Sequence, residues 1–500
     1  MNYRTLRIQV FGGIFVAALA ISGCGGGDDE ILTISPVGPT VVEKGTTLQF
    51  TASQSDVTFS VEGGSGNGTI SAGGLYTPPS TLPVGEPEIT VVAEDSDGDI
   101  AEATVSLRTA DTITLGSPTP VNTVPLTQLG LSDFGLGFNS NRIAVGLGSI
   151  HEMSVFTAEN SPATNLFLAQ ALDFGSFSAV NLTNSTSISE LSSAIELDSQ
   201  LNPHILFARG DFSSQVLMYV ASSTDQGASF EEAVPLTAPP VADVSQIMGF
   251  MAQDGNEDLH VVFSSLNDVT GTGEIIYTRS ADSGQTWNSP VIVDSGSDDL
   301  IFPSLAVNDD GSNVFVAFYD TDIDRVVFSR SLDSGANFSE PIPLSLVASN
   351  NAPFTKVQLD SAGTVYVALS DDLGTDNIYE AVLRKSTNQG ASFGPGVPVN
   401  SASANANFVI VNMAIDDLDR IDFVWTLDPD NSGDSDSLFH SRSIDGGTTF
   451  GDPDVVAAGP VGSQVFSRGV RHDESGRLYI QYVVTEILSG TGDIFVRRGE

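Results

Sequence analysis

The chain has 500 residues, a formal net charge of −44 and one cysteine. A single cysteine excludes a disulfide scaffold and a thiolate metal site. Nucleic acid is not an expected partner, because an acidic chain with no basic patch repels phosphates. Hydrophobic residues make up 40% of the chain, which favours a folded protein over a disordered one.

The first element in chain order is an export signal over residues 1–23. Arg4 and Arg7 begin it, and an uncharged stretch follows, as in a secretory signal peptide. Its end, Ile-Ser-Gly-Cys, resembles the lipobox of bacterial lipoproteins. That resemblance implies cleavage before Cys24, lipid on that cysteine, and a place in the bacterial cell envelope, at the outer membrane or the cell surface. The alternative is an ordinary signal peptide with an incidental cysteine.

A flexible tether over residues 24–30 precedes a small β-domain, which we expect over residues 31–108. Apolar residues alternate with polar ones at 46–52, 88–94 and 103–107, which predicts half-buried strands of a sandwich. Residues 68–79 of this segment resemble a recurring motif of bacterial Ig-like domains. In such proteins this module spaces or presents its neighbour.

A short motif recurs in the remainder of the chain, and its best copy, residues 280–287, reads Ser-Ala-Asp-Ser-Gly-Gln-Thr-Trp. It resembles the Asp-box of sialidase-like BNR repeats. A fifth copy, starting at Ser386, has Asn388 in place of the aspartate. The key positions of the other four copies are Ser223, Asp225 and Gly227; Ser280, Asp282, Gly284 and Trp287; Ser331, Asp333 and Gly335; and Ser443, Asp445 and Gly447.

The composition of the box predicts a structural role. Its hydroxyl and carboxylate can accept hydrogen bonds from turn amides, its glycine relieves the backbone, and its aromatic ring fills a gap. The resemblance places the boxes on the outer part of each blade, away from the active face. Arg279, Arg330 and Arg442 recur just before boxes, so we interpret them as structural too.

Each unit between boxes is predicted to hold four strands, for example around 304–307, 314–318, 326–330 and 342–344. Four-stranded units repeated in series predict a β-propeller over residues 112–500, which makes the whole chain all-β. The strand pattern favours seven blades, with six as the alternative. The last set lacks a fourth strand, so the segment 112–121 is expected to close the ring.

Sialidases need arginines that converge on a carboxylate, together with a tyrosine nucleophile. The resemblance makes Arg142, Arg209, Arg468 and Arg471 the candidates for such a cluster, with Tyr319 or Tyr482 as the nucleophile. Arg142 belongs to Arg-Ile-Ala, a partial match to the Arg-Ile-Pro of the family.

The remaining candidate site is an acidic loop that carries Asp428, Asp430, Asp434 and Asp436. Alternate carboxylates and a glycine could bind calcium, which is the one cofactor we consider; the alternative is a solvated loop without an ion. The five histidines show no metal-ligand spacing.

Taken together, these features predict a lipid-anchored binding protein of the envelope or cell surface. Its expected partners are the membrane, through the lipid, and a glycan or another envelope or extracellular protein. The first alternative is a sialidase-like exo-glycosidase, and the second is a structural component of the envelope.

Overall fold

The structure is a computed structural model of the 500-residue chain. It describes residues 32–79, 88–108, 113–121, 142–145, 151–160, 163–172, 176–183, 188–211, 215–237, 244–267, 269–346, 354–372, 379–399, 409–427, 437–460, 463–473, 475–486 and 491–499. Strands dominate these ranges, which confirms the all-β prediction. Among the described residues, no helix has the length and apolar character that crossing a membrane requires.

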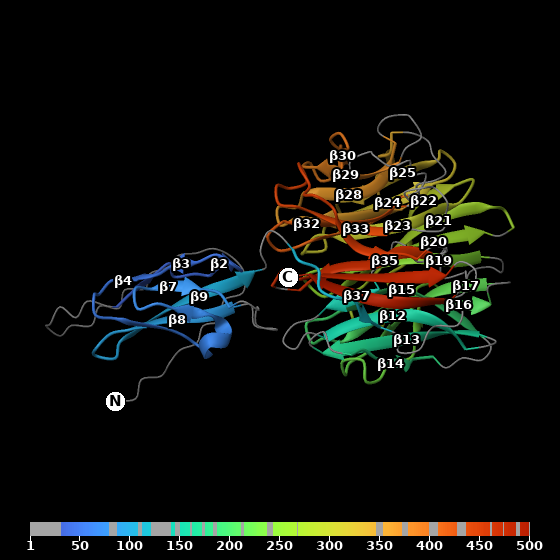
Figure 1. Ribbon diagram of the computed structural model, residues 1–500. Coiled ribbons are helices and arrows are strands. Elements are labelled where there is room, and N and C mark those ends of the chain that lie inside the picture. The colour runs from blue at the N-terminus through green and yellow to red at the C-terminus, as the bar shows by residue number, and fades with distance from the viewer. Residues whose placement is uncertain are drawn as a thin grey trace.

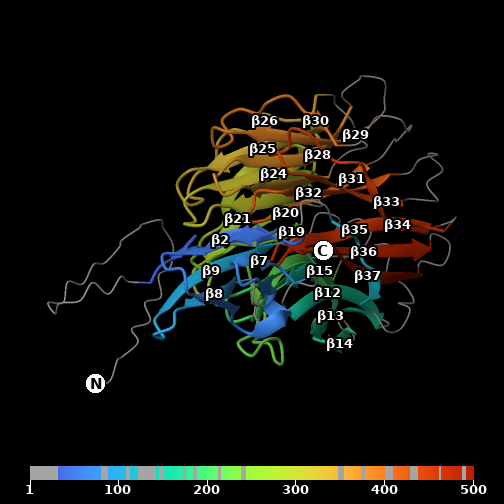
Figure 2. The same ribbon diagram turned by 60° about the vertical axis from the view of Figure 1, so that its left-hand side comes forward.

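An N-terminal sandwich begins at residue 32 and ends at Arg108 (Figures 1 and 2). Its strands pair in the orders β2-β9-β8-β5, β3-β7-β6 and β1-β4. The alternating residues Phe50, Val91 and Val105 meet in one core, as the pattern predicts. The strands are β1 (Ile34–Ser35), β2 (Thr40–Glu43), β3 (Leu48–Gln49), β4 (Thr51–Ala52), β5 (Thr58–Val61), β6 (Thr69–Ile70), β7 (Leu75–Thr77), β8 (Glu88–Glu94) and β9 (Ile100–Arg108), with a 3-10 turn at Gly64–Asn67.

The prediction of one continuous strand over residues 46–52 is wrong. This segment forms two short strands, β3 and β4, which pair with different partners, β7 and β1. The break falls at Phe50, whose amide donates to the carbonyl of Gly74 (2.8 Å) while its ring is buried in the core.

The remaining described strands form seven four-stranded units, here called blades; one parallel pair, Val216 with Ser245, joins blades 2 and 3 into an eight-stranded sheet. Blade 1 holds β11 (Ile143–Val145), β12 (His151–Asn160), β13 (Ala163–Leu172) and β14 (Ser178–Asn181); blade 2 holds β15 (Ser189–Leu197), β16 (Pro203–Asp211), β17 (Gln215–Ser222) and β18 (Val234–Pro235). Blade 3 holds β19 (Val244–Gln253), β20 (Leu259–Asn267), β21 (Thr272–Ser280) and β22 (Val291–Gly296); blade 4 holds β23 (Leu300–Val307), β24 (Val314–Asp320), β25 (Arg325–Ser331) and β26 (Ile342–Pro343). Blade 5 holds β27 (Thr355–Leu359), β28 (Val365–Asp371), β29 (Glu380–Ser386) and β30 (Val397–Pro398); blade 6 holds β31 (Val409–Ile415), β32 (Ile421–Leu427), β33 (Ser437–Ser443) and β34 (Asp454–Ala458).

Blade 7 combines the two ends of this part of the chain. It holds β35 (Ser463–His472), β36 (Leu478–Glu486) and β37 (Thr491–Gly499), and its fourth strand is β10 (Thr119–Pro120). Thr119 pairs with Val496 in antiparallel register. The N-terminal segment therefore closes the ring, as predicted, and the seventh blade ties both ends of the propeller together.

The first strand of each blade contacts the first strand of the next in the series β11, β15, β19, β23, β27, β31 and β35, and β35 contacts β11. This closed series makes a seven-bladed propeller and overturns the six-bladed alternative. Each second strand lies between two neighbouring blades, which explains why β28 is buried along its whole length.

One bidentate ion pair joins the sandwich to the propeller. Arg108, the last residue of β9, donates from Nε and Nη2 to Asp417 Oδ1 and Oδ2 at 3.1 and 2.5 Å. Asp417 lies in the turn between β31 and β32. The sandwich is therefore held against the propeller face that carries this turn.

Candidate functional site

The boxes have the hydrogen-bond geometry of closed turns between the third and fourth strands of a blade. Ser331 Oγ accepts from the amide of Gly335 (2.9 Å) and donates to Asp333 Oδ1 (2.7 Å). Asp333 also accepts from the amide and the side chain of Asn337. The same Ser-to-Asp and Gly-to-Ser bonds occur in the boxes that begin at Ser223, Ser280 and Ser443.

The aspartate carboxylates of the boxes already accept hydrogen bonds from their own turns. Hydrogen bonds from the Asn337 side chain, the Ser331 hydroxyl and the Asn337 amide lower the pKa of Asp333 to about 2. Such a group is a poor proton donor near neutral pH. The box aromatics pack on strands, as Phe338 does edge-on against Tyr277 of blade 3 (5.3 Å between ring centroids), so the box also joins neighbouring blades.

The arginines that precede the boxes are also engaged within the fold. Arg279 pairs with Asp258 at 2.6 Å, and Arg442 pairs with Asp422 at 2.6 Å. Arg330 donates to the carbonyl of Gln389 (2.5 Å) in the box of the next blade. Each of them therefore holds two strands or two blades together.

A second recurring turn, which we did not predict from the sequence, joins the first two strands of a blade, and we call it the inner turn. Asp360 shows its geometry: Oδ1 accepts from the amides of Ala362 (3.1 Å) and Thr364 (2.7 Å). The available signal was an aspartate or asparagine that recurs once before each of the five boxes and once more after the last box. These residues are Asp198, Asp254, Asn308, Asp360, Asp416 and Asp473.

Inner turns and boxes share one face of the propeller, since the amide of Gln226 in a box donates to Asn202 of an inner turn (3.0 Å). Hydrogen bonds also join the inner turns of blades 2 and 3 (Ser199 to Glu257, 2.9 Å) and of blades 5 and 6 (Ser361 to Asp419, 2.7 Å). The inner turns of blades 4 and 5 exchange none within the described residues.

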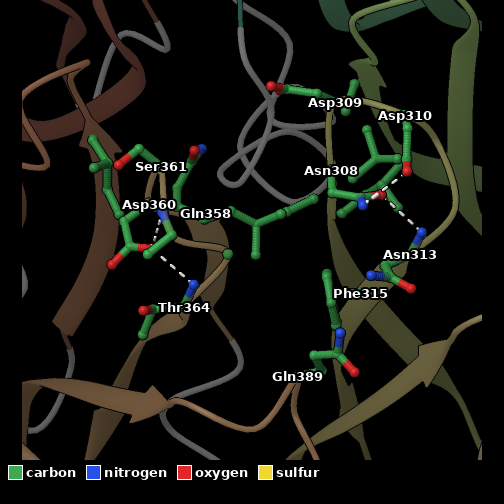
Figure 3. A pocket seen from close by; sticks show the side chains of 18 of the residues that line it. Asn308, Asp309, Asp310, Asn313, Phe315, Gln358, Asp360, Ser361, Thr364 and Gln389 are labelled. Atoms are coloured by element: carbon green, nitrogen blue, oxygen red, sulfur yellow. Dashed lines mark hydrogen bonds between the residues drawn. The ribbon is translucent and has the colours of Figure 1, made fainter. Parts of the chain in front are cut away.

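A cavity of about 1150 Å³ lies at this gap between blades 4 and 5 and extends across the central channel to blades 2, 3, 6 and 7, whose Glu196, Gln253, Asp417 and Arg471 also line it. Figure 3 shows Asp360 and Ser361 of one inner turn across from Asn308 and Asp310 of the other. Asn388 of the fifth box also lines it. The cavity thus lies on the face that carries the boxes, whereas the resemblance puts the active face at the other end.

The channel side of the cavity carries a group of charged side chains. Arg471, from the end of β35, pairs with Glu196 from the end of β15, and both line the cavity. Behind them the buried Lys356 places Nζ 4.0 Å from the ring centroid of Phe250. Burial, helped by the charge of Arg471 and opposed by that of Glu196, lowers the pKa of Lys356 well below its usual range.

The four candidate arginines do not gather at one place. Arg209 pairs with Glu190 (3.1 Å) at the beginning of β15, and Arg471 pairs with Glu196 near its end. Arg142 and Arg468 do adjoin, because the amide of Arg142 donates to the carbonyl of Arg468 (3.1 Å). Their relative exposures are 1% and 4%, so neither side chain is open to solvent.

The side chains of the two candidate tyrosines are hydrogen-bonded or stacked within the propeller. Tyr319 donates to Asp324 Oδ1 (3.2 Å), and burial raises its pKa. Tyr482 stacks on Phe495 (5.5 Å between ring centroids), and burial raises its pKa to about 12. Raised pKa values disfavour the phenolate form that a nucleophile requires.

Two predicted sites lie outside the described residues. One is Cys24 with the tether, and the other is the proposed calcium loop with Asp428, Asp430, Asp434 and Asp436. Within the ranges that the structure describes, no group of three or more His, Cys, Asp or Glu side chains is arranged to hold a metal ion.

No protein-family model matches the sequence, and no curated protein matches it. Solved structures are similar to it in fold. A polysaccharide lyase, an ulvan lyase of family PL25, is 14% identical, covers 76% of this chain and 95% of its own, and has a TM-score of 0.46. A Hadza microbial sialidase is 11% identical, the matched region covers 77% of this chain and 77% of the sialidase, and the TM-score is 0.42. The Trypanosoma rangeli sialidase is 12% identical, covers 83% of this chain and 57% of its own, and has a TM-score of 0.43.

Proposed function

We propose that the protein is an exported, lipid-anchored binding protein whose propeller takes a glycan in the cavity between blades 4 and 5. The cavity itself carries this proposal, since a large concave site with converging polar groups is the default place for a ligand. Its volume of about 1150 Å³ is enough for several sugar rings.

The lining is suited to hydroxyl groups. Residues with polar side chains line it, among them Asp310, Asp360, Ser361, Asn388 and Gln389. Because both inner turns are fixed by their own hydrogen bonds, these groups are held in place before a ligand arrives. Preorganised donors and acceptors favour binding of a polar ligand.

A glycan array tests the proposal, with the soluble chain from Gly25 onward as the probe. We expect binding to a limited set of glycans, and loss of that binding in Ser361→Trp, which fills the cavity. A Ser297→Trp chain, altered at an exposed turn away from the cavity, is the control. An array without any hit, from protein shown to be folded, would contradict the glycan ligand; capture of an envelope protein instead would favour the protein-partner alternative.

Lipid on Cys24 and a place at the outer membrane or cell surface are part of the same proposal. We further propose that a tether over residues 24–30 separates this anchor from an Ig-like domain (31–108), and that residues 112–500 form a BNR-type propeller. Labelling with palmitate in a bacterial host should mark the wild-type chain and not Cys24→Ala. A chain that remains in stable complexes after detergent extraction would favour a structural envelope component.

A sialidase-like exo-glycosidase is the second candidate, and the contact between Arg142 and Arg468 favours it. It brings two of the four candidate arginines together between blades 1 and 7. Hydrolysis of fluorogenic sialosides, measured with and without calcium and high salt, tests this activity. Cleavage that disappears in Arg142→Ala would replace binding by catalysis as the main function.

A further inference from the structure

The fifth box differs from the other four at one functional atom. Asp225, Asp282, Asp333 and Asp445 carry a carboxylate where Asn388 carries an amide. In the described boxes the side chain two positions after the serine has the same structural task, which is to accept a hydrogen bond from that serine. Asn388 Oδ1 performs it too, accepting from Ser386 Oγ (2.8 Å) and from the amide of Ser392 (3.1 Å).

The local turn therefore does not require the amide. An aspartate at 388 could accept from the Ser392 hydroxyl, as Asp225 does from Ser229 (2.6 Å). With asparagine the direction is reversed, and Nδ2 donates to Ser392 Oγ (2.9 Å). Within the described residues this is the one acceptor of Nδ2, which has a second hydrogen to donate. Asn388 is exposed, and it lines the cavity.

The inner turns show a parallel exception at the same place. Asn308 stands where the other five described turns have aspartate, and it also lines the cavity. Here the turn gives a reason, because Asn308 Nδ2 donates to Asp310 Oδ1 (2.9 Å), which a second carboxylate would repel. As at Asn388, an amide stands in place of a carboxylate, so one negative charge fewer lines the cavity. The hydrogen bond from Asn308 also fixes the side chain of Asp310 beside the cavity.

We infer that Asn388 is a specificity-determining residue of the cavity, where its free N–H donates to an uncharged, hydroxyl-rich sugar. This inference rests on the proposed glycan-binding function. A cationic ligand would bind more tightly to an aspartate, as the other boxes have, than to Asn388. An anionic sugar would face Asp309, Asp310 and Asp360, whose carboxylates pair with no basic side chain among the described residues. Arg471, which also lines the cavity, is already paired with Glu196. A neutral sugar oxygen is the acceptor that this combination favours.

The test is Asn388→Asp, which restores the common form of the box. The reverse change, Asp225→Asn in the box of blade 2, is the matched control, because Asp225 has a serine partner, Ser229, as Asn388 has Ser392, and does not line the cavity. We expect both variants to melt within a few degrees of wild type, since an amide and a carboxylate both complete the turn. Affinity for the neutral glycan should fall about tenfold in Asn388→Asp and stay unchanged in Asp225→Asn.

The measurement is calorimetric titration of the best array glycan and of its uronic acid counterpart. A wild-type chain that binds no glycan overturns the proposed function, and this inference with it. A wild type that binds while Asn388→Asp binds equally well overturns the inference alone. Tighter binding of the acidic sugar than of the neutral one would also overturn it, because the ligand class would then be wrong.

Discussion

His472 of blade 7 donates from Nε2 to Asp422 Oδ2 of blade 6 at 2.6 Å, across the boundary between the two blades. The same carboxylate accepts from His440 Nε2 (2.6 Å) and from Nε and Nη2 of Arg442. All four side chains are buried. Asp422 therefore joins three basic side chains from two blades inside the propeller.

Loss of this carboxylate should destabilise the propeller strongly. Asp422→Asn removes the carboxylate charge that the buried guanidinium of Arg442 pairs with at 2.6 Å, and breaking a buried ion pair typically costs about 3 to 5 kcal/mol. Urea unfolding should show the loss, while Asp452→Asn, at an exposed position, should stay within about 0.5 kcal/mol of wild type. Equal stability of the two variants would contradict this account of the cluster.

The same group predicts a pH dependence. Burial opposes the charge of Asp422, but the charge of Arg442 and the hydrogen bonds of His440 and His472 outweigh it and hold its pKa well below the usual range. An aspartate whose pKa is depressed by folding stabilises above its unfolded pKa of about 3.9 and loses this contribution as pH falls towards the folded pKa.

The difference in unfolding free energy between wild type and Asp422→Asn should thus be largest above about pH 5 and shrink below about pH 4. Urea midpoints measured across this range check it. A difference that stays constant down to acid pH would show that the charge of Asp422 does not stabilise the fold.

Replacing the glycine of a box should destabilise the propeller for two reasons that can be measured separately, namely backbone strain and a steric clash. Gly335 has φ 82°, and a Cβ there would overlap the ring of Tyr277 in the neighbouring blade. Gly271 has φ 72° but no heavy atom within 4 Å of such a Cβ. Gly271→Ala should cost about 1 to 2 kcal/mol, for backbone strain alone, and Gly335→Ala about 1 to 3 kcal/mol more. Thermal melts of both variants give the comparison, and equal losses would refute the packing role.

The serine of a box should matter because it serves a buried amide. Ser443→Ala removes the acceptor of the Gly447 amide (2.9 Å), and an unsatisfied buried donor costs about 1 to 3 kcal/mol. Thr448→Ala, at an exposed position of the same turn, should cost less than about 0.5 kcal/mol. Chemical denaturation of the pair checks the prediction, and a larger loss in Thr448→Ala would reverse the assignment.

The contact between sandwich and propeller should depend on salt. The Arg108–Asp417 pair is partly exposed, and such pairs contribute about 0.2 to 1 kcal/mol and are screened by ions. In small-angle scattering, Arg108→Gln should enlarge the radius of gyration as high salt does, while the melting of each domain stays the same. The exchanged pair Arg108→Asp with Asp417→Arg should restore the wild-type value; if it does not, the ion pair is not what orients the sandwich.

The sequence alone determined the repeat and the local structure of each unit. The strands around Val314–Asp320 and Arg325–Ser331 were visible because apolar alternation is a local pattern. Box positions were visible because their hydrogen bonds join residues only two to four positions apart. Counting these units, together with the unpaired N-terminal segment, gave seven blades and the closure by β10.

Only the tertiary structure decided which side chains meet. Glu190 and Glu196 lie in one strand, yet they bind Arg209 and Arg471 at its opposite ends. Asn388 and the inner turn of blade 4 line one cavity, although they belong to different blades. These contacts depend on how whole blades pack around the channel, and the spacing of residues within a repeat contains no information about that packing.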